Sequence, residues 1–296
     1  MTGIPLTLQI ADVGPELVHL IGPKAANLGE LMRLGCRVPS GFIVATPAYE
    51  AHAKAWGLQP LIDHLLGTIK RTGAGVFEEE SLDTASAEIR NLFVGKHMHP
   101  ELAAQIRDSL KTVNASLFAV RSSGTAEDLP NLSFAGAHES YLNVKASECC
   151  QRVVDCWASL YTSRAIYYRD INHVSSFGMG IAGIVQEMIV GEFSGVILTS
   201  DPEKPKYLFV EAVAGFGDAL VSGGATPSSY LFRKVNGKIS TKEEVEGVAL
   251  SDIALRQLFD GGMSIEEHFG CGQDIEFTIR RDSVFFLQTR PITASS

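Results

Sequence analysis

The last part of the chain contains the pattern that most limits how it can fold. Residues 274–279 alternate polar and apolar side chains, residues 284–291 form an apolar run that continues into Gln288, Thr289 and Arg290, and the short polar segment 280–283 lies between them. Alternation with a period of two is typical of half-buried strands, and a short polar segment between two such runs is typical of a turn. The pattern therefore predicts an antiparallel hairpin with Asp282 at the centre of its turn.

One face of this hairpin is predicted to be polar and the other apolar. With Asp282 at the centre, Glu276 faces Gln288 and Asp274 faces Arg290 on one side. Acids, an amide and an arginine gathered on one face are typical of a platform for metal and phosphate. An ordinary solvated face of a two-sided sheet is the alternative. The apolar face is predicted to consist of Ile275, Phe277, Ile279, Phe285 and Leu287.

Composition limits the class of protein. The chain has 296 residues, of which 45% are hydrophobic and 20% charged, so it can bury a sizeable core in one large domain or two lobes. Its net charge of −9 argues against a nucleic-acid partner, because phosphate backbones bind basic surfaces. The sequence shows neither a long apolar run nor a basic segment followed by an apolar one at its start, so we expect no membrane span and a cytoplasmic location.

Several familiar kinds of site are excluded because their sequence motifs are absent or lie in the wrong context. The five cysteines form no C-x-x-C pair, which argues against zinc and against a disulfide framework. The P-loop motif and the H-E-x-x-H motif are both absent from the sequence. Residues 178–183 fit G-x-G-x-x-G, but they lead into the strand-like segment 184–189 where a dinucleotide-binding fold requires a helix.

Coarse periodicity predicts helices in the first half of the chain and strands in the second. Gly22-Pro23 opens a helical repeat that places Lys24 at the start of a helix. The remaining predicted elements are a helix at 22–34, a strand within 38–45, helices across 47–115, a strand at 117–121, an amphipathic helix at 148–168, strands from 181 onward and a helix near 251–259. We expect a boundary near 185–190, which gives an N-terminal lobe of residues 1–187 and a C-terminal lobe of residues 188–296.

The segment after the strand at 117–121 has the composition of a phosphate-binding loop. Arg121 ends the strand, and its guanidinium offers a bidentate fork to phosphate oxygens. The hydroxyls that follow and the backbone N–H groups near Gly124 add neutral donors. The small residues of 133–137 would allow a lid to approach a triphosphate closely. The alternative is a simple turn in which an acid pairs with Arg121.

Taken together, segments 22–31, 120–136 and 274–291 resemble the N-terminal nucleotide-binding domain of phosphoenolpyruvate synthase and pyruvate phosphate dikinase. This domain is a relative of the ATP-grasp fold and also occurs in rifampicin phosphotransferase. The resemblance covers nearly the whole chain and implies an α+β, two-lobed ATP-grasp-like fold that binds MgATP between its lobes.

The resemblance also implies roles for individual residues. Phosphoryl transfer needs cations and a metal to offset charge and asks little covalent chemistry of the protein, in agreement with these roles. By resemblance, Lys24, Arg121 and Arg290 bind the triphosphate and act in catalysis, Ser133 and Gly136 belong to the phosphate loop, Glu276 and Gln288 hold Mg²⁺, Gln186, Glu187, Met188 and Ile189 read the adenine, and Glu211 lines the nucleotide site.

Whole members of this family continue into a swivelling domain with a phosphorylated histidine and then into an acceptor domain, and neither is present in this sequence. The chain is therefore expected to be an excised domain or the ATP subunit of a split enzyme, as in the phenylphosphate synthase type. We expect it to pass a phosphoryl or pyrophosphoryl group from ATP to a histidine on a partner, with AMP and phosphate as eventual products. The alternatives are an ADP-forming ATP-grasp ligase and a non-catalytic ATP-sensing module.

Overall fold

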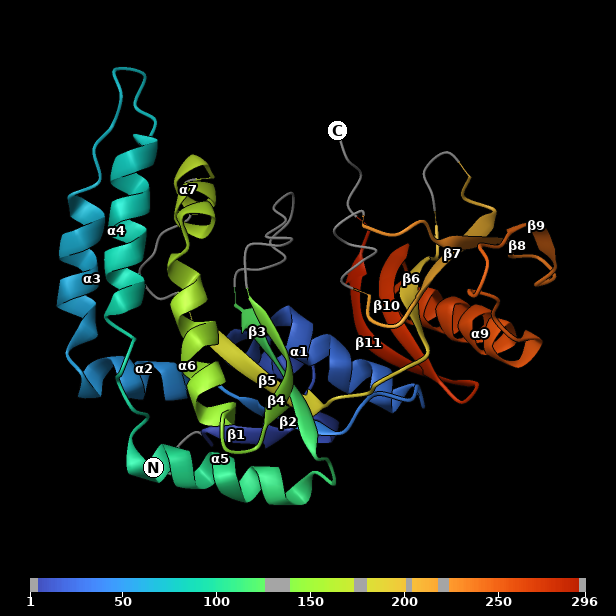
Figure 1. The fold of residues 1–296 in the computed structure, drawn as a ribbon, viewed down its shortest axis with the longest axis horizontal. Helices are drawn as coiled ribbons and strands as arrows, with labels where there is room; N and C mark the ends of the chain where they lie inside the picture. The colour runs from blue at the N-terminus through green and yellow to red at the C-terminus, as the bar shows by residue number, and fades with distance from the viewer. Residues whose placement is uncertain (1–4, 126–138, 173–179, 201–203, 218–223, 293–296) are drawn as a thin grey trace. The chain divides into compact units, whose positions relative to one another are not determined.

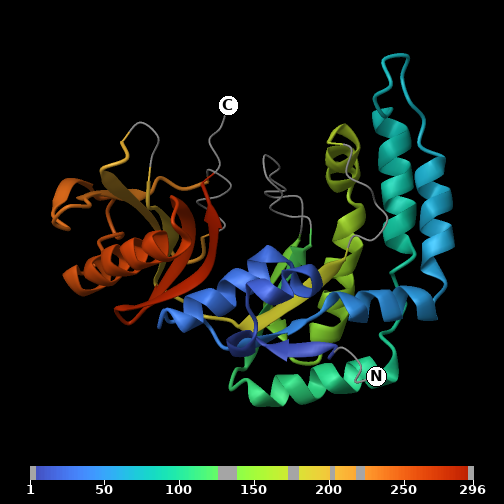
Figure 2. The same ribbon diagram turned by 180° about the vertical axis from the view of Figure 1, so that it is seen from behind.

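The computed structural model describes residues 5–125, 139–172, 180–200, 204–217 and 224–292. The chain forms two compact units (Figures 1 and 2), one made of residues 1–26 and 40–188 and the other of residues 27–39 and 189–296. The predicted boundary at 187–188 assigned residues 27–39 to the first lobe, whereas the structure groups them with the second unit. The predicted α+β class is confirmed. Among the described residues, no helix is both long and apolar enough to span a membrane.

The first unit contains an antiparallel five-stranded sheet. Its strand order is β1-β2-β5-β3-β4, and the central strand β5 is almost completely buried. The predicted strands near 38–45 and 117–121 are confirmed, but β3 continues three residues beyond Arg121. The strands are β1 (Thr7–Gln9), β2 (Gly41–Val44), β3 (Leu117–Gly124), β4 (Ser140–Lys145) and β5 (Ile181–Glu187).

Helices surround this sheet. The helical prediction for 47–115 is confirmed, and α6 covers the face of the sheet that carries Phe118 and Val120. The single helix predicted for 148–168 is wrong, because the chain turns at Thr162, whose φ and ψ of −63° and 149° are extended and whose side chain caps α7. The helices are α2 (Thr46–Ala55), α3 (Leu58–Gly67), α4 (Glu79–Asn91), α5 (Pro100–Thr112), α6 (Cys149–Ala158) and α7 (Ser163–Ile171).

Helix α1 (Val18–Arg33) starts four residues before the predicted helix 22–34, and the predicted helix corresponds to its second part. Gly22 interrupts it with φ 74° and ψ 161°, and Pro23 begins the part that carries Lys24. Proline suits the first position of a helix because that position needs no N–H donor. The residues of α1 up to Ala26 belong to the first unit and those from Asn27 belong to the second.

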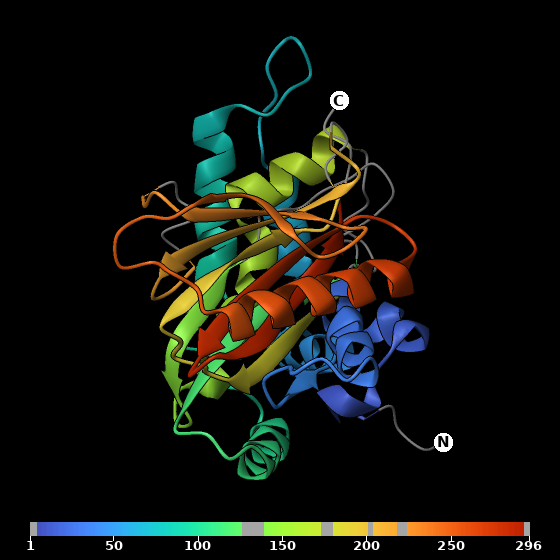
Figure 3. The same cartoon turned by 90° about the vertical axis from the view of Figure 1, so that its right-hand side faces the viewer.

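The second unit contains an antiparallel six-stranded sheet with one long helix, α9 (Asp252–Phe269), across one of its faces (Figure 3). This helix is longer than predicted; Ser251 caps its start and Gly270, with φ 67°, ends it. Two of the strands, β8 and β9, were not individually predicted. In sheet order, the strands are β11 (Ser283–Pro291), β10 (Gln273–Arg280), β6 (Phe193–Leu198), β7 (Tyr207–Ala214), β8 (Ser228–Arg233) and β9 (Ile239–Glu243).

The hairpin of β10 and β11 confirms both predicted polar pairs, since Glu276 faces Gln288 and Asp274 faces Arg290. The predicted turn centre is wrong. Arg280 pairs with Ser283, which leaves a two-residue turn. Its two residues both have positive φ, 50° at Arg281 and 60° at Asp282, as in a type I′ hairpin.

A β-bulge reconciles the short turn with the correct outer pairs. The register shifts after Glu276, so that Phe277 pairs with Phe286 and Leu287 is the extra residue of the bulge. The prediction that Phe285 and Leu287 lie in the core is therefore wrong, because both are half-buried. The buried side chains of the hairpin include Ile275, Phe277 and Ile279, as predicted, together with Val284, Phe286 and Thr289.

Candidate functional site

In the first unit, the structure brings Lys24 to the strand that carries Arg121. The Lys24 ammonium donates a hydrogen bond to the backbone oxygen of Ser122 at 3.3 Å, next to Arg121 in the chain. Side chains alternate along β3, so Arg121 lies on the same face as Ser123, whose hydroxyl accepts from the Ala25 N–H of α1 at 3.2 Å. Lys24 thus lies beside the segment of β3 that carries Arg121, at the start of a helix whose dipole favours anions.

Gly22 makes this close approach possible. A Cβ atom at this position would lie 2.4 Å from the Ser123 hydroxyl oxygen and 2.9 Å from the Gly124 carbonyl oxygen. Its φ of 74° is also one that side-chain-bearing residues rarely adopt. A glycine is therefore required two residues before Lys24.

The hydroxyl groups after Arg121 do not have their predicted role. Ser122 and Ser123 lie inside β3 and are 1% and 0% exposed. Ser122 donates to the Glu139 backbone oxygen, Ser123 caps α1, and Thr125 donates to the Gly180 oxygen at 3.1 Å. These side chains fix the backbone around Arg121, and the prediction that they supply neutral donors to phosphate is wrong.

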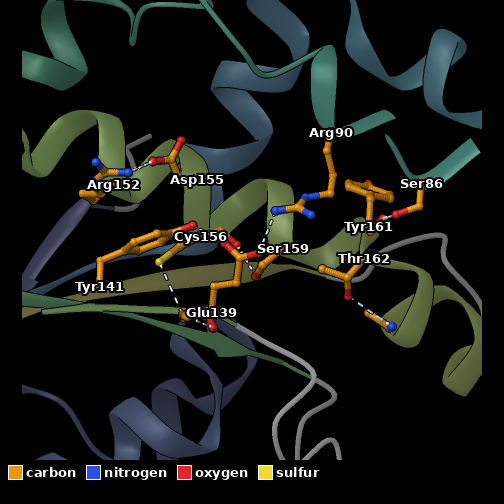
Figure 4. A network of polar contacts seen from close by, with 12 residues as sticks. Ser86, Arg90, Glu139, Tyr141, Arg152, Asp155, Cys156, Ser159, Tyr161 and Thr162 are labelled. Atoms are coloured by element: carbon orange, nitrogen blue, oxygen red, sulfur yellow. Dashed lines mark hydrogen bonds and ion pairs between the residues drawn. The ribbon is translucent and has the colours of Figure 1, made fainter. Parts of the chain in front are cut away.

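A polar network around Glu139 anchors the start of β4, the strand that pairs with β3 (Figure 4). The Glu139 carboxylate forms an ion pair with Arg90 of α4 at 2.6 Å and accepts a hydrogen bond from the Tyr141 hydroxyl. Burial, reinforced by the hydrogen bond to Glu139, raises the pKa of Tyr141. The predicted phosphate-loop residues Ser133 and Gly136 lie outside the described residues.

The predicted adenine-reading segment is divided between the two units, because Met188 belongs to the first and Ile189 to the second. Its backbone is partly occupied, because the Glu187 N–H donates to Ser40 at 2.7 Å and the Met188 N–H donates to Leu117 at 2.9 Å. The Gln186 side chain is 2% exposed. A purine would have to use other groups of this segment than these two N–H donors.

In the second unit, the predicted site residues share the face of the sheet opposite α9. The register places Gln288, Glu276, Val196 and Glu211 in one row across β11, β10, β6 and β7. Neighbouring strands lie about 4.8 Å apart, so Glu276 and Glu211 are about 10 Å apart at the backbone. Burial raises the pKa of Glu211, which makes a nearby cation favourable there.

Glu276 and Gln288 suit a magnesium ion that is shared with a phosphate ligand. The Gln288 amide donates to a Glu276 carboxylate oxygen at 3.4 Å, so the two side chains are already adjacent. No cluster of three or more histidine, cysteine or acidic side chains occurs within the part of the chain that the structure describes. A donor set this small fits Mg²⁺, which commonly takes one or two protein oxygens and completes its octahedron with phosphate and water.

Arg290 is oriented by its predicted partner. Its Nε and Nη2 atoms donate to the same Asp274 oxygen at 3.0 and 2.7 Å, and its side chain is 38% exposed. A charge-assisted pair of this kind limits the positions of the guanidinium. Arg290 and the Glu276–Gln288 pair therefore occupy neighbouring rows of one face.

Asn27 is a polar contact of this region for which no role was predicted. Its side-chain amide donates to the backbone oxygen of Thr289 at 3.0 Å, between Gln288 and Arg290. The sequence contained one signal, since Asn27 lies three residues after Lys24 in the same helix, but its partner is 262 residues away in sequence.

Comparisons with known proteins show the family of the chain. The sequence profile of the family "Pyruvate phosphate dikinase, AMP/ATP-binding domain" matches residues 18–247 and 233–296. A probable phosphoenolpyruvate synthase from Archaeoglobus fulgidus is 36% identical over 97% of this chain and 41% of its own length. A rifampicin phosphotransferase from Streptomyces sviceus is 35% identical over 97% of this chain and 36% of its own length.

The chain thus spans about two-fifths of the length of these relatives. Among solved structures, a D-alanine–D-alanine ligase from Helicobacter pylori matches 66% of this chain and 47% of its own at 10% identity, with a TM-score of 0.33 that is too low to support an argument. The profile match and the identities to curated relatives are sufficient by themselves to assign the family. The chain belongs to the pyruvate phosphate dikinase AMP/ATP-binding domain family.

Proposed function

We propose that this chain is the MgATP-binding module of a dikinase-type phosphotransferase. The observation that carries the proposal is the polar face of the second unit, where Glu276 and Gln288 lie beside the oriented guanidinium of Arg290. Family membership supplies the nucleotide class, and this donor set suits a metal-bound polyphosphate.

Each described residue has a specific task in this proposal. Lys24, Arg121 and Arg290 neutralise phosphate oxygens. Glu276 and Gln288 would hold Mg²⁺, which supplies charge stabilisation on the phosphate oxygens when it is bound. Glu211 lines the nucleotide site, and residues 186–189 contact the adenine.

The acceptor is proposed to be a histidine on a separate domain or subunit. Transfer of the terminal pyrophosphoryl group to an imidazole nitrogen breaks the bond between the α- and β-phosphates of ATP and leaves AMP. Later hydrolysis of the bound pyrophosphate releases phosphate, and the remaining phosphoryl group passes to an acceptor on a further domain. A cytoplasmic location and the absence of nucleic-acid or membrane partners remain predictions.

Product analysis tests this function. The chain is incubated with MgATP, with and without a separately made histidine domain from a related enzyme, and the nucleotides are separated by chromatography. AMP that forms only with the histidine domain is the expected result. ADP formed with an added carboxylate substrate would indicate a ligase instead, and nucleotide binding without any turnover would indicate an ATP sensor.

Variants assign the turnover to the proposed residues. Arg121→Ala and Arg290→Ala should each lower AMP formation by about a hundredfold or more, because each removes a cation from the developing charge. Their melting temperatures should change much less than their activities, since both side chains are only half-buried and neither belongs to the hydrophobic core. A loss of melting temperature that matches the loss of activity in both variants would contradict these roles.

A further inference from the structure

Contacts with Gln257, Arg37 and Asn27 secure the outer edge of strand β11, and the last of them lies inside the proposed metal and phosphate platform. Among the described strands, β11 is at the edge of its sheet, so its outward backbone groups face no other described strand. The Val284 N–H donates to the Gln257 side chain at 3.2 Å, and the Phe286 N–H donates to the Arg37 backbone oxygen at 2.8 Å. The third contact is the 3.0 Å hydrogen bond from the Asn27 amide to the Thr289 oxygen.

This third contact holds the backbone of Thr289, between the proposed metal ligand Gln288 and the proposed phosphate ligand Arg290. Thr289 separates Gln288 from Arg290, and its own side chain points to the opposite, buried face, where it donates to Gln273 at 2.8 Å. The bulge at Leu287 interrupts the ladder immediately before Gln288. Because regular pairing is lost there, the position of Gln288 depends on the anchors that follow the bulge.

We propose that Asn27 is a positioning residue that fixes the Thr289 carbonyl and thereby places the Gln288 amide for Mg²⁺ and the Arg290 guanidinium for phosphate. The proposal rests on the function proposed above. Residues that orient metal ligands without touching the metal commonly affect metal affinity by about 10- to 100-fold. Asn27 touches neither ligand in this role and acts only through the backbone of β11.

The chain supplies a matched control at the other end of the same strand. Gln257 on α9 donates its amide to the Asp282 backbone oxygen at 2.8 Å, near the turn of the hairpin. Asn27→Asp and Gln257→Glu each replace an amide donor by an isosteric carboxylate that cannot donate to a carbonyl. Both variants lose one side-chain hydrogen bond to the hairpin, but only the first loses it beside Gln288 and Arg290.

The measurement is the concentration of Mg²⁺ at which ATP binding is half-maximal, determined by calorimetric titration of ATP at a series of Mg²⁺ concentrations. Asn27→Asp should raise this concentration by about tenfold or more, and Asn27→Ala should do the same without adding a charge. Gln257→Glu should leave the half-maximal Mg²⁺ concentration within about twofold of the wild-type value. Its melting temperature should nevertheless fall by about as much as that of Asn27→Asp, because each variant loses one hydrogen bond.

The outcomes separate this proposal from the one on which it rests. Equal Mg²⁺ requirements in the Asn27 and Gln257 variants would reduce Asn27 to an edge cap and overturn the inference alone. An Asn27→Asp variant that loses only thermal stability would overturn it in the same way. A wild-type chain that binds no ATP at any Mg²⁺ concentration would refute the proposed function, and the role of Asn27 would fall with it.

Discussion

At the scale of single residues, Gly22 combines two constraints that a matched pair of substitutions can separate. Gly22→Ala should destabilise the protein by about 2–4 kcal/mol, because it strains a positive φ and drives a Cβ into Ser123 and Gly124. Gly35→Ala is the control, since Gly35 has a φ of 75° but no atom within 4 Å of its Cβ position, and should cost about 1 kcal/mol. Denaturant unfolding measures both, and equal losses would contradict the packing argument.

His52 predicts a pH dependence of stability. Its ring is 0% exposed, stacks on Phe93 and contacts Trp157 in a tilted arrangement, and burial lowers its pKa from 6.5 to about 4. Above pH 6.5 the residue is neutral in both states. Between pH 6.5 and 4 the unfolded chain binds a proton that the folded chain does not. The free energy of unfolding should therefore fall by about 3 kcal/mol in total as the pH is lowered from 6.5 to 4.

Comparison with His52→Phe isolates this contribution from those of the other seven histidines. Phenylalanine retains an aromatic ring in the stack but cannot bind a proton. The difference in unfolding free energy between the two proteins should therefore change steadily from pH 6.5 down to pH 4 and be constant above pH 6.5. A difference that is independent of pH would show that His52 does not titrate in this way.

Residue chemistry determined how far the sequence could specify the site. Lys24 was predictable as a residue at a helix start because Gly22-Pro23 is a strong local signal. The fates of Ser122 and Ser123 were not predictable, because their partners on α1 and β4 are distant in sequence. The local sequence around a hydroxyl residue that follows an arginine is the same whether its side chain faces a ligand or another part of the chain.

At the scale of elements, the hairpin turn is a place where stability can be increased. Arg281 has a φ of 50° without being a glycine, and asparagine tolerates this conformation better than arginine. Arg281→Asn should stabilise the protein by about 0.5 kcal/mol. Arg280→Asn is the control, since Arg280 lies in β10, where asparagine is disfavoured, and should have the opposite sign. Thermal unfolding compares them, and a decrease in both would contradict the turn assignment.

The same hairpin shows why its outer pairs were predictable when its turn was not. A three-residue turn without a bulge and a two-residue turn with one bulge give identical pairs at Asp274 and Glu276. They differ only between the bulge and the turn, where the buried positions shift from Phe285 and Leu287 to Val284 and Phe286. Alternation alone cannot distinguish these cases, because both contain apolar residues at all four positions.

At the scale of the whole molecule, the predicted nucleotide residues are distributed over both compact units. Lys24 and Arg121 belong to the first, and Glu211, Glu276, Gln288 and Arg290 belong to the second. Alternation and turn signals along the chain gave the approximate extent of most elements, whereas the assignment of residues 27–39 to the second unit depends on contacts such as that of Asn27 with Thr289. Long-range contacts of this kind leave no periodic signal in a single sequence.

A chain with a net charge of −9 should bind a polyphosphate well only when a metal offsets the charge. MgATP at a hundred times its dissociation constant should stabilise the folded protein by about 2.7 kcal/mol, and ATP with a chelator should stabilise it much less.

Glu276→Gln should abolish the increment due to magnesium, because it removes the carboxylate beside Gln288. Glu267→Gln makes the same change of charge on the exposed side of α9 and should behave like the wild type. Thermal unfolding with ATP, with and without magnesium, measures each protein. A full magnesium increment in Glu276→Gln would show that the ion binds elsewhere, and an equal loss in both variants would reduce the effect to net charge.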